Sequence, residues 1–331
     1  MHGKKGMGMK INAVFEGGGV KAVGLAGAVA ETEKRGFKFY HMAGTSSGSI
    51  IAAMLAAGYT GEQLRSIIEA TPFSSFLKKT WIHRMQWVGP AIRVFVKKGL
   101  YSGEALEQWV QQILAARGVR TFGDLAPNQL RIIASDISQG KLMVLPDDIA
   151  QYGMDPKKFS VARAIRMSTS IPYFFDPVML CKQKPGILKG EAFRKQFVYV
   201  VDGGILSNFP LWIFDKEKEK ADEKGIPVIG YQLVGRTDKE PKHISGPISM
   251  FQALFSTMMD AHDERYIEEF NQYRTVKIPT VGVQATQFNL SPEKSEELYQ
   301  SGVRSAAKYF DQWSISTYQK NCDKYPPKLL I

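Results

Sequence analysis

The sequence predicts an α/β fold: a single domain with a mainly parallel central sheet flanked by helices. Three observations support this prediction. Short β-rich runs alternate with helical stretches, which favours a sheet covered on both faces. Glycine-rich turns separate the first strands from the helices that follow them. Hydrophobic residues make up 44% of the 331 residues and charged residues 23%, as in a globular protein with a large buried core.

The expected strands are short apolar runs, and the expected helices have apolar residues at helical spacing. Strands are expected over residues 11–15, 39–43, 130–134, 142–145, 197–201, 228–234 and 275–278. Helices are expected over residues 24–35, 49–57, 106–114, 215–224 and 291–310. Because no repeat or flexible linker divides the chain, residues 10–310 are expected to form the domain. Residues 1–9 and 311–331 are then terminal extensions.

The amino-acid composition indicates which binding partners and which cellular compartment to expect. A formal net charge of +11 favours anionic partners, namely nucleic acid, acidic headgroups or acidic substrates. With only Cys181 and Cys322 present, a disulfide framework is not expected and a reducing compartment fits best. The N-terminus does not resemble a signal peptide, and no apolar stretch is long enough to span a membrane. A cytoplasmic protein that visits membrane surfaces peripherally is therefore expected.

Residues 44–48, Gly-Thr-Ser-Ser-Gly, fit the GxSxG pattern of a nucleophile elbow. In this strand-to-helix turn the serine oxygen is lifted clear of the sheet, and Gly44 and Gly48 avoid collisions that side chains would cause. Ser46 is the candidate nucleophile, because a frame centred on Ser47 would lack the flanking glycines. An ordinary glycine-rich turn can match the same five residues, although the expected strand before it and apolar helix after it favour the elbow.

Gly17, Gly18 and Gly19 form a second glycine-rich turn between an expected strand and helix. Three successive glycines leave backbone N–H groups free to converge on developing negative charge, as an oxyanion hole requires. The spacing also satisfies the dinucleotide fingerprint GxGxxG/A, with Ala22 in the last position. That alternative expects an acidic residue at the end of the second strand, where the sequence has Met42-Ala43-Gly44 instead.

Asp202 ends an expected strand and is followed by Gly203 and Gly204. A carboxylate there can accept the serine proton if it lies within hydrogen-bond reach, although Asp-Gly is also a common turn. A three-residue triad would need a histidine downstream of both residues, and the candidates are His243 and His262. His243 lies in a loop flanked by proline and glycine, and His262 lies in an acidic helical stretch. A Ser/Asp pair is thus favoured over the triad. The alternatives are a triad esterase that uses His243 or His262, and a non-catalytic nucleotide- or lipid-binding protein.

With these three motifs in order, the chain resembles the patatin-like phospholipases. The resemblance is carried by EGGGVK at 16–21, GTSSGS at 44–49 and DGG at 202–204. Supporting blocks are TFGDL at 121–125, ARAIRMSTSIPYFF at 162–175 and SNFP at 207–210. The family usually has a glycine where this chain has Ala22, which makes the loop slightly less pliable.

The resemblance implies a Ser/Asp dyad that hydrolyses acyl esters of phospholipids or lysophospholipids without cofactor or metal. Ser46 would attack the ester, and Asp202 would accept its proton and later activate the deacylating water. Gly17, Gly18 and Gly19 would hold the oxyanion, and Lys21 would support the loop electrostatically. Gly44, Gly48, Gly203 and Gly204 would shape the turns that carry the dyad.

A basic, aromatic stretch is the candidate membrane contact. Between Ala70 and Gly103 there is no acidic residue, and Lys78, Lys79, Trp81 and Trp87 all occur there. Basic residues interleaved with Trp are typical of helices that lie in an anionic membrane interface. A lid, or a helix packed on the core with its lysines in water, fits the same pattern. No nucleic-acid-binding motif is present, so nucleic acid is not expected as a partner.

Overall fold

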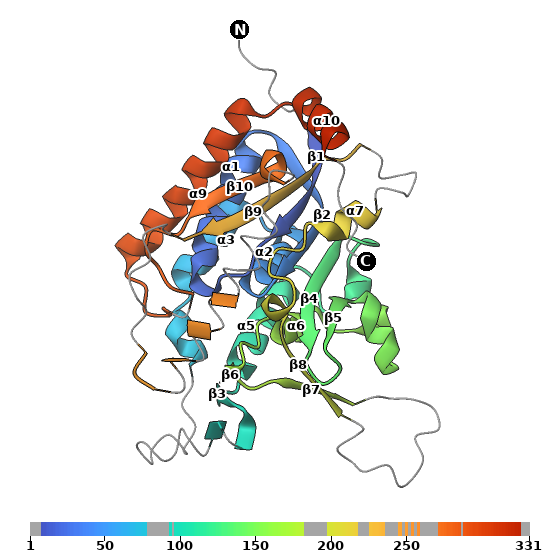
Figure 1. Cartoon of the computed structure of the whole chain (residues 1–331), viewed down its shortest axis with the longest axis vertical. Coiled ribbons are helices and arrows are strands. Elements are labelled where there is room, and N and C mark those ends of the chain that lie inside the picture. Colours follow the sequence, from blue (N-terminus) through green and yellow to red (C-terminus); the bar gives the residue numbers. More distant parts are fainter. Residues whose placement is uncertain are drawn as a thin grey trace.

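The computed structural model has one central sheet with helices on both sides (Figure 1). It describes residues 8–77, 93–94, 96–181, 197–217, 225–235, 244–246, 249–250, 253–254, 257–258, 271–285 and 287–325. The strands are β1 (Met9–Phe15), β2 (Phe37–Thr45), β3 (Gly99–Tyr101), β4 (Leu130–Asp136), β5 (Lys141–Leu145), β6 (Tyr173–Phe175), β7 (Val178–Cys181), β8 (Phe197–Asp202), β9 (Val228–Val234) and β10 (Thr275–Pro279). The helices are α1 (Val23–Lys34), α2 (Ser47–Ala56), α3 (Gly61–Ala70), α5 (Glu104–Ala115), α6 (Val161–Ser168), α7 (Trp212–Glu217), α9 (Pro292–Gln312) and α10 (Ile315–Lys324).

The strand order in the main sheet is β10-β9-β1-β2-β4-β8-β7, with β5 also paired to β4. The five strands from β10 to β4 run parallel, whereas β5, β7 and β8 are antiparallel to their neighbours. The larger core cluster lies between the sheet and α1, α2, α3, α5 and α9. A smaller cluster, which includes Phe209 and Phe214, covers the other face beside α7. The predicted α/β class with a mainly parallel sheet is confirmed.

All seven expected strands are present, within a few residues of the expected ends. The expected helices are present too. The helix expected over residues 215–224 corresponds to α7 (Trp212–Glu217), and residues 218–224 lie outside the described residues. α3 is not among the expected helices, and its Thr60 forms a capping box with Gln63. Residues 311–331, expected as a terminal extension, include α10, which packs on the core through Tyr318, whose hydroxyl accepts the Val228 N–H at 2.9 Å.

Two strands meet end to end along one edge of β4. β2 runs parallel to the first half of β4 and ends with Thr45 opposite Ile133. β8 runs antiparallel to the second half and ends with Asp202 opposite Ala134. Since β5 occupies the other edge of both halves, β2 and β8 must share the same edge. Their carboxyl ends therefore arrive at neighbouring positions of β4, although 156 residues separate Ser46 from Asp202.

Candidate active site

Ser46 occupies a sharp turn between β2 and α2, with φ 51° and ψ −128°. A positive φ is uncommon for a residue other than glycine, and such backbone strain is concentrated at functional sites. The flanking glycines are required because the chain doubles back closely here. A Cβ on Gly44 would lie 2.4 Å from the Gly48 carbonyl oxygen, and one on Gly48 would lie 2.3 Å from that of Phe15.

Ser46 and Asp202 are in direct contact. Ser46 Oγ donates a hydrogen bond to Asp202 Oδ2 at 2.6 Å, and Gly204 N donates to Asp202 Oδ1 at 2.8 Å. Burial raises the pKa of Asp202 to about 7, although the hydrogen bonds from Ser46 and Gly204 oppose this shift. A carboxylate with a pKa near neutrality and within hydrogen-bond reach of a hydroxyl can act as its general base.

The C-terminal end of α6 contacts the backbone of both residues. Ser46 N donates to Ser168 Oγ at 2.8 Å, and Ser168 Oγ in turn donates to the Ile133 carbonyl at 2.5 Å. Asp202 N donates to the Ser170 carbonyl at 2.9 Å. Neither Ser168 nor Ser170 was predicted as a site residue, because nothing in the local pattern of residues 162–175 shows what these serines contact.

The glycine loop lies beside the serine, but its three amides are not equivalent. Gly17 N donates to the Asn208 carbonyl at 3.3 Å, and Gly18 N donates to Ser47 Oγ at 3.0 Å. For Gly19 N, no acceptor is found within the described part of the chain. Gly19 has φ 58°, and a Cβ there would lie 2.0 Å from the Ala285 carbonyl oxygen, so only glycine fits at this position. Of the three amides, that of Gly19 is therefore the one without a described acceptor.

Lys21, Gly203 and Glu16 pack on or hydrogen-bond to the turns around the site. The Lys21 side chain lies along Gly18, where an added Cβ would be 3.3 Å from its Cε, and Lys21 N donates to the Gly18 carbonyl at 3.2 Å. A Cβ on Gly203 would lie 2.3 Å from the Ile133 carbonyl oxygen, so the turn after β8 packs directly on β4. The buried Glu16 carboxylate, to which sequence reasoning gave no role, accepts hydrogen bonds from Leu233 N and from Asn208 Nδ2.

An apolar pocket lies beside Ser46 and is lined by Ile50, Ile51 and Met54 of α2. Gly19, Ser46 and Ser47 also contribute to its lining. The remaining lining is largely apolar and includes Ile68, Phe73, Phe76, Leu106, Trp109, Ile171, Phe175 and Phe288. A concave apolar site with a few convergent polar groups is what a ligand with a long apolar portion requires.

Several sequence predictions fall outside the described residues. These are the triad candidates His243 and His262 and the membrane-contact candidates Lys78, Lys79, Trp81 and Trp87. Within the described ranges, no group of three or more His, Cys, Asp and Glu side chains is arranged to hold a metal ion. Nor do those ranges contain a helix that is both long and apolar enough to span a membrane.

A family model described as patatin-like phospholipase matches residues 13–215, which is more than half of the chain. The chain belongs to this family. The resemblance seen in the sequence motifs is thereby confirmed, and membership in the patatin-like family supports a lipid hydrolase. Residues beyond 215, including Ala285 and Phe288 at the site, lie outside the matched region.

Two relatives match nearly the whole chain. The uncharacterized protein YqhO of Bacillus subtilis (strain 168) is 42% identical over 311 residues, covering 92% of this chain and 100% of the relative. The uncharacterized protein R571 of Acanthamoeba polyphaga mimivirus is 23% identical over 309 residues, covering 89% and 91% of the two chains. The crystal structure of VipD from Legionella pneumophila is similar in fold, with a TM-score of 0.53 and 16% identity. That match covers 91% of this chain and 66% of VipD, just under two thirds.

Proposed function

We propose that this protein is a serine acyl hydrolase that cleaves carboxylic esters of phospholipids or lysophospholipids through a Ser46/Asp202 dyad. The observation that carries the proposal is the 2.6 Å hydrogen bond from Ser46 Oγ to a fully buried carboxylate oxygen of Asp202. A nucleophile in direct contact with its base is the arrangement that covalent acyl transfer requires.

In the proposed mechanism, Ser46 Oγ attacks the ester carbonyl carbon while its proton passes to Asp202. The oxyanion of the tetrahedral intermediate accepts a hydrogen bond from Gly19 N–H, and from Gly18 N–H once that amide leaves Ser47 Oγ. The C–O bond to the alcohol then breaks, and the alkoxide takes the proton from Asp202. Water attacks the acyl-serine in the same way, with Asp202 as base, and releases the fatty acid and the free serine.

The apolar pocket along α2 is proposed to hold the acyl chain of the substrate. Ile68, Phe73 and Phe288 line both this pocket and an adjoining groove. Burying methylene groups against these side chains would contribute roughly 0.8 kcal/mol per CH₂. Acyl-chain length should thus influence the specificity constant kcat/KM.

Substituting Ile68 with tryptophan is expected to shorten the pocket. Long-chain p-nitrophenyl esters should lose roughly tenfold in kcat/KM relative to short-chain esters, because the last methylene groups no longer fit. A series of esters of increasing chain length measures this. Ile67→Trp is the matched control, since Ile67 is also half-buried on α3 but does not line the pocket. Equal losses for all chain lengths, or an equal effect of the control, would contradict the assignment.

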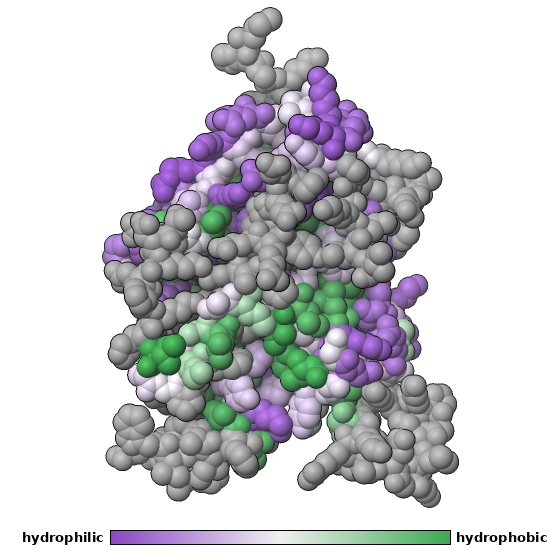
Figure 2. Space-filling view, viewed as in Figure 1, coloured by the Kyte–Doolittle hydropathy of each residue, from purple (hydrophilic) through white to green (hydrophobic). Residues whose placement is uncertain are grey.

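Peripheral association with an anionic membrane is the second part of the proposal. It is supported by the net charge of +11 and by apolar side chains that reach the surface. Figure 2 shows hydrophobic side chains gathered across the middle of one face, over the region of β4, β5 and β8, whereas α9 and α10 are largely hydrophilic there. Leu206, four residues after Asp202, is 38% exposed, and Met179 on β7 is 54% exposed. The basic stretch that contains Trp81 and Trp87 would add electrostatic attraction.

One experiment tests both parts. Vesicles of a defined phospholipid mixture with anionic lipid are incubated with wild type or Ser46→Ala, at low and high salt, and the lipids are quantified by mass spectrometry. Wild type alone should release fatty acid, and the release should fall at high salt because exposed charges are screened. Equal release of fatty acid by wild type and Ser46→Ala would reject the dyad. Equal release by wild type at low and high salt would reject electrostatic association with the membrane. No release from any lipid, with turnover of a soluble chromogenic ester retained, would reject phospholipid as substrate.

A further inference from the structure

Arg166 on α6 is a buried arginine without a carboxylate partner in hydrogen-bond contact within the described part of the chain. It is 3% exposed, and burial lowers the pKa of its guanidinium to about 10. A buried charge is costly unless its hydrogen-bonding groups are satisfied, so such a residue usually holds specific neighbours in place. The neighbours of Arg166 therefore indicate what it does.

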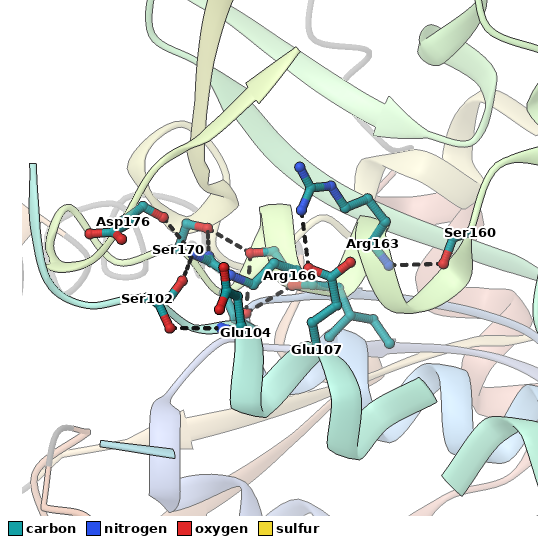
Figure 3. Close-up of polar contacts among 10 residues, drawn as sticks. Ser102, Glu104, Glu107, Ser160, Arg163, Arg166, Ser170 and Asp176 are labelled. Atoms are coloured by element: carbon teal, nitrogen blue, oxygen red, sulfur yellow. Dashed lines mark hydrogen bonds and ion pairs between the residues drawn. The ribbon is translucent and has the colours of Figure 1, made fainter. Parts of the chain in front are cut away.

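The guanidinium joins three segments of the chain (Figure 3). Arg166 Nη1 donates to Ser170 Oγ, and Arg166 Nη2 donates to the carbonyl oxygens of Ser102 and, at 2.6 Å, Asp176. The planar fork of an arginine can satisfy such separated acceptors at once, which a lysine cannot. Gly103 makes room for it, because a Cβ there would lie 2.4 Å from Arg166 Nε.

Ser170 connects this cluster to the proposed dyad. Its hydroxyl donates back to the Arg166 carbonyl at 2.6 Å, while its carbonyl accepts the Asp202 N–H at 2.9 Å. Two residues earlier, Ser168 Oγ accepts the Ser46 N–H at 2.8 Å. The segment 168–170 thus holds the backbone of both Ser46 and Asp202, and Arg166 holds that segment through Ser170.

We propose that Arg166 is a positioning residue, which keeps residues 168–170 in the conformation that brings Ser46 Oγ within hydrogen-bond reach of Asp202. This inference rests on the proposed function of the dyad. Arg166 does not itself line the apolar pocket at Ser46, and of the segment that it holds only Thr169 is among the lining residues, so its main effect is expected on the chemical step. Misplacement of reacting groups by about 1 Å can cost roughly 100-fold in rate.

Arg163, one turn earlier on α6, offers a matched control. Its side chain is 40% exposed and forms an ion pair with Glu107 at 3.1 Å. It makes no described contact with residues 168–170. Arg163→Met therefore removes an arginine from the same helix without touching the dyad.

The test compares Arg166→Met and the milder Arg166→Lys with Arg163→Met and wild type, using a soluble chromogenic ester. Both Arg166 variants should lower kcat, by roughly 100-fold for Arg166→Met, with KM changed less than about twofold. The acidic limb of the kcat profile should move to higher pH, because Asp202 loses the Ser46 hydrogen bond that lowers its pKa. A folded Arg166 variant with the kcat and pH profile of Arg163→Met would overturn the proposal. If Arg166→Met does not fold, Arg166→Lys decides.

A crystal structure of the folded Arg166 variant separates this inference from the proposed function. Lengthening of the 2.6 Å contact between Ser46 Oγ and Asp202 Oδ2 supports positioning, whatever the reaction is. An unchanged contact overturns it. Failure of the dyad would show differently, as full turnover by Ser46→Ala.

Discussion

Replacing Ser46 with alanine is expected to lower ester turnover by at least roughly 10⁴-fold, since the variant lacks the hydroxyl that is proposed to form the acyl intermediate. The variant should fold normally, because the alanine keeps the backbone N–H that bonds to Ser168. The strained φ of 51° is expected in both proteins, so any difference in stability should come from the lost hydrogen bond between Ser46 and the buried Asp202 carboxylate. Hydrolysis of a chromogenic acyl ester, followed over time, measures the loss.

Covalent labelling gives this prediction a second readout. A fluorophosphonate probe should modify wild type at Ser46 and leave Ser46→Ala unlabelled, as shown by peptide mass spectrometry. Ser66→Ala is a suitable control, because Ser66 lies on α3 and its hydroxyl donates only to the Glu62 carbonyl at 3.1 Å. Near-normal turnover of Ser46→Ala, or labelling at another serine, would remove Ser46 from the mechanism.

Replacing Asp202 with asparagine should lower turnover by roughly 10³-fold or more and, at the same time, stabilise the fold at pH 8. Asparagine has nearly the same shape and can keep contacts to Gly204 and Ser46, but it cannot accept the serine proton. Stabilisation is expected because wild type must bury an ionised carboxylate at this pH, with 0% of the residue exposed. Thermal unfolding and ester hydrolysis of the same samples measure both effects.

The free energy of unfolding should depend on pH because the pKa of Asp202 is raised in the folded state. The pKa of Asp202 is raised in the folded state, from 3.8 to about 7, so the folded state binds the proton more tightly than the unfolded state does. Unfolding free energy from this group is therefore lost as pH rises from about 4 to about 7. Asp202→Asn should be more stable than wild type at pH 8 and nearly equal to it at pH 4. Wild-type activity should fall as pH drops below about 7, and a stability difference that is the same at both pH values would contradict this account.

The turns that carry the site could be predicted from the sequence because their requirements are local. Gly44 and Gly48 flank Ser46 at positions where a Cβ would collide with backbone oxygens. That steric requirement produces the GxSxG pattern in the sequence. Gly19 is restricted locally too, since its positive φ excludes most other residues. Strand ends could also be predicted, since β9 has the expected bounds and β1 and β2 differ only by a few residues.

Roles that depend on distant contacts could not be predicted in this way. Arg166 and Ser170 differ little in pattern from other polar residues of a helix end, and only packing brings them to Asp202. Ala285 and Phe288 contact the glycine loop and the pocket from a part of the chain whose local pattern contains no motif. The Gly17 and Gly18 amides likewise donate hydrogen bonds to the Asn208 carbonyl and Ser47 Oγ, which the local glycine pattern does not predict.

The α/β class and the three glycine-bearing turns can be read from the chain alone, because strand periodicity and steric exclusion act over a few residues. The contact between Asp202 and Ser46 depends on the folded sheet. The physical reason is the pairing of β4, whose single edge receives β2 and β8 from opposite directions and brings their ends together at Ile133 and Ala134. Burial at that junction then raises the pKa of Asp202, an effect that no local pattern contains.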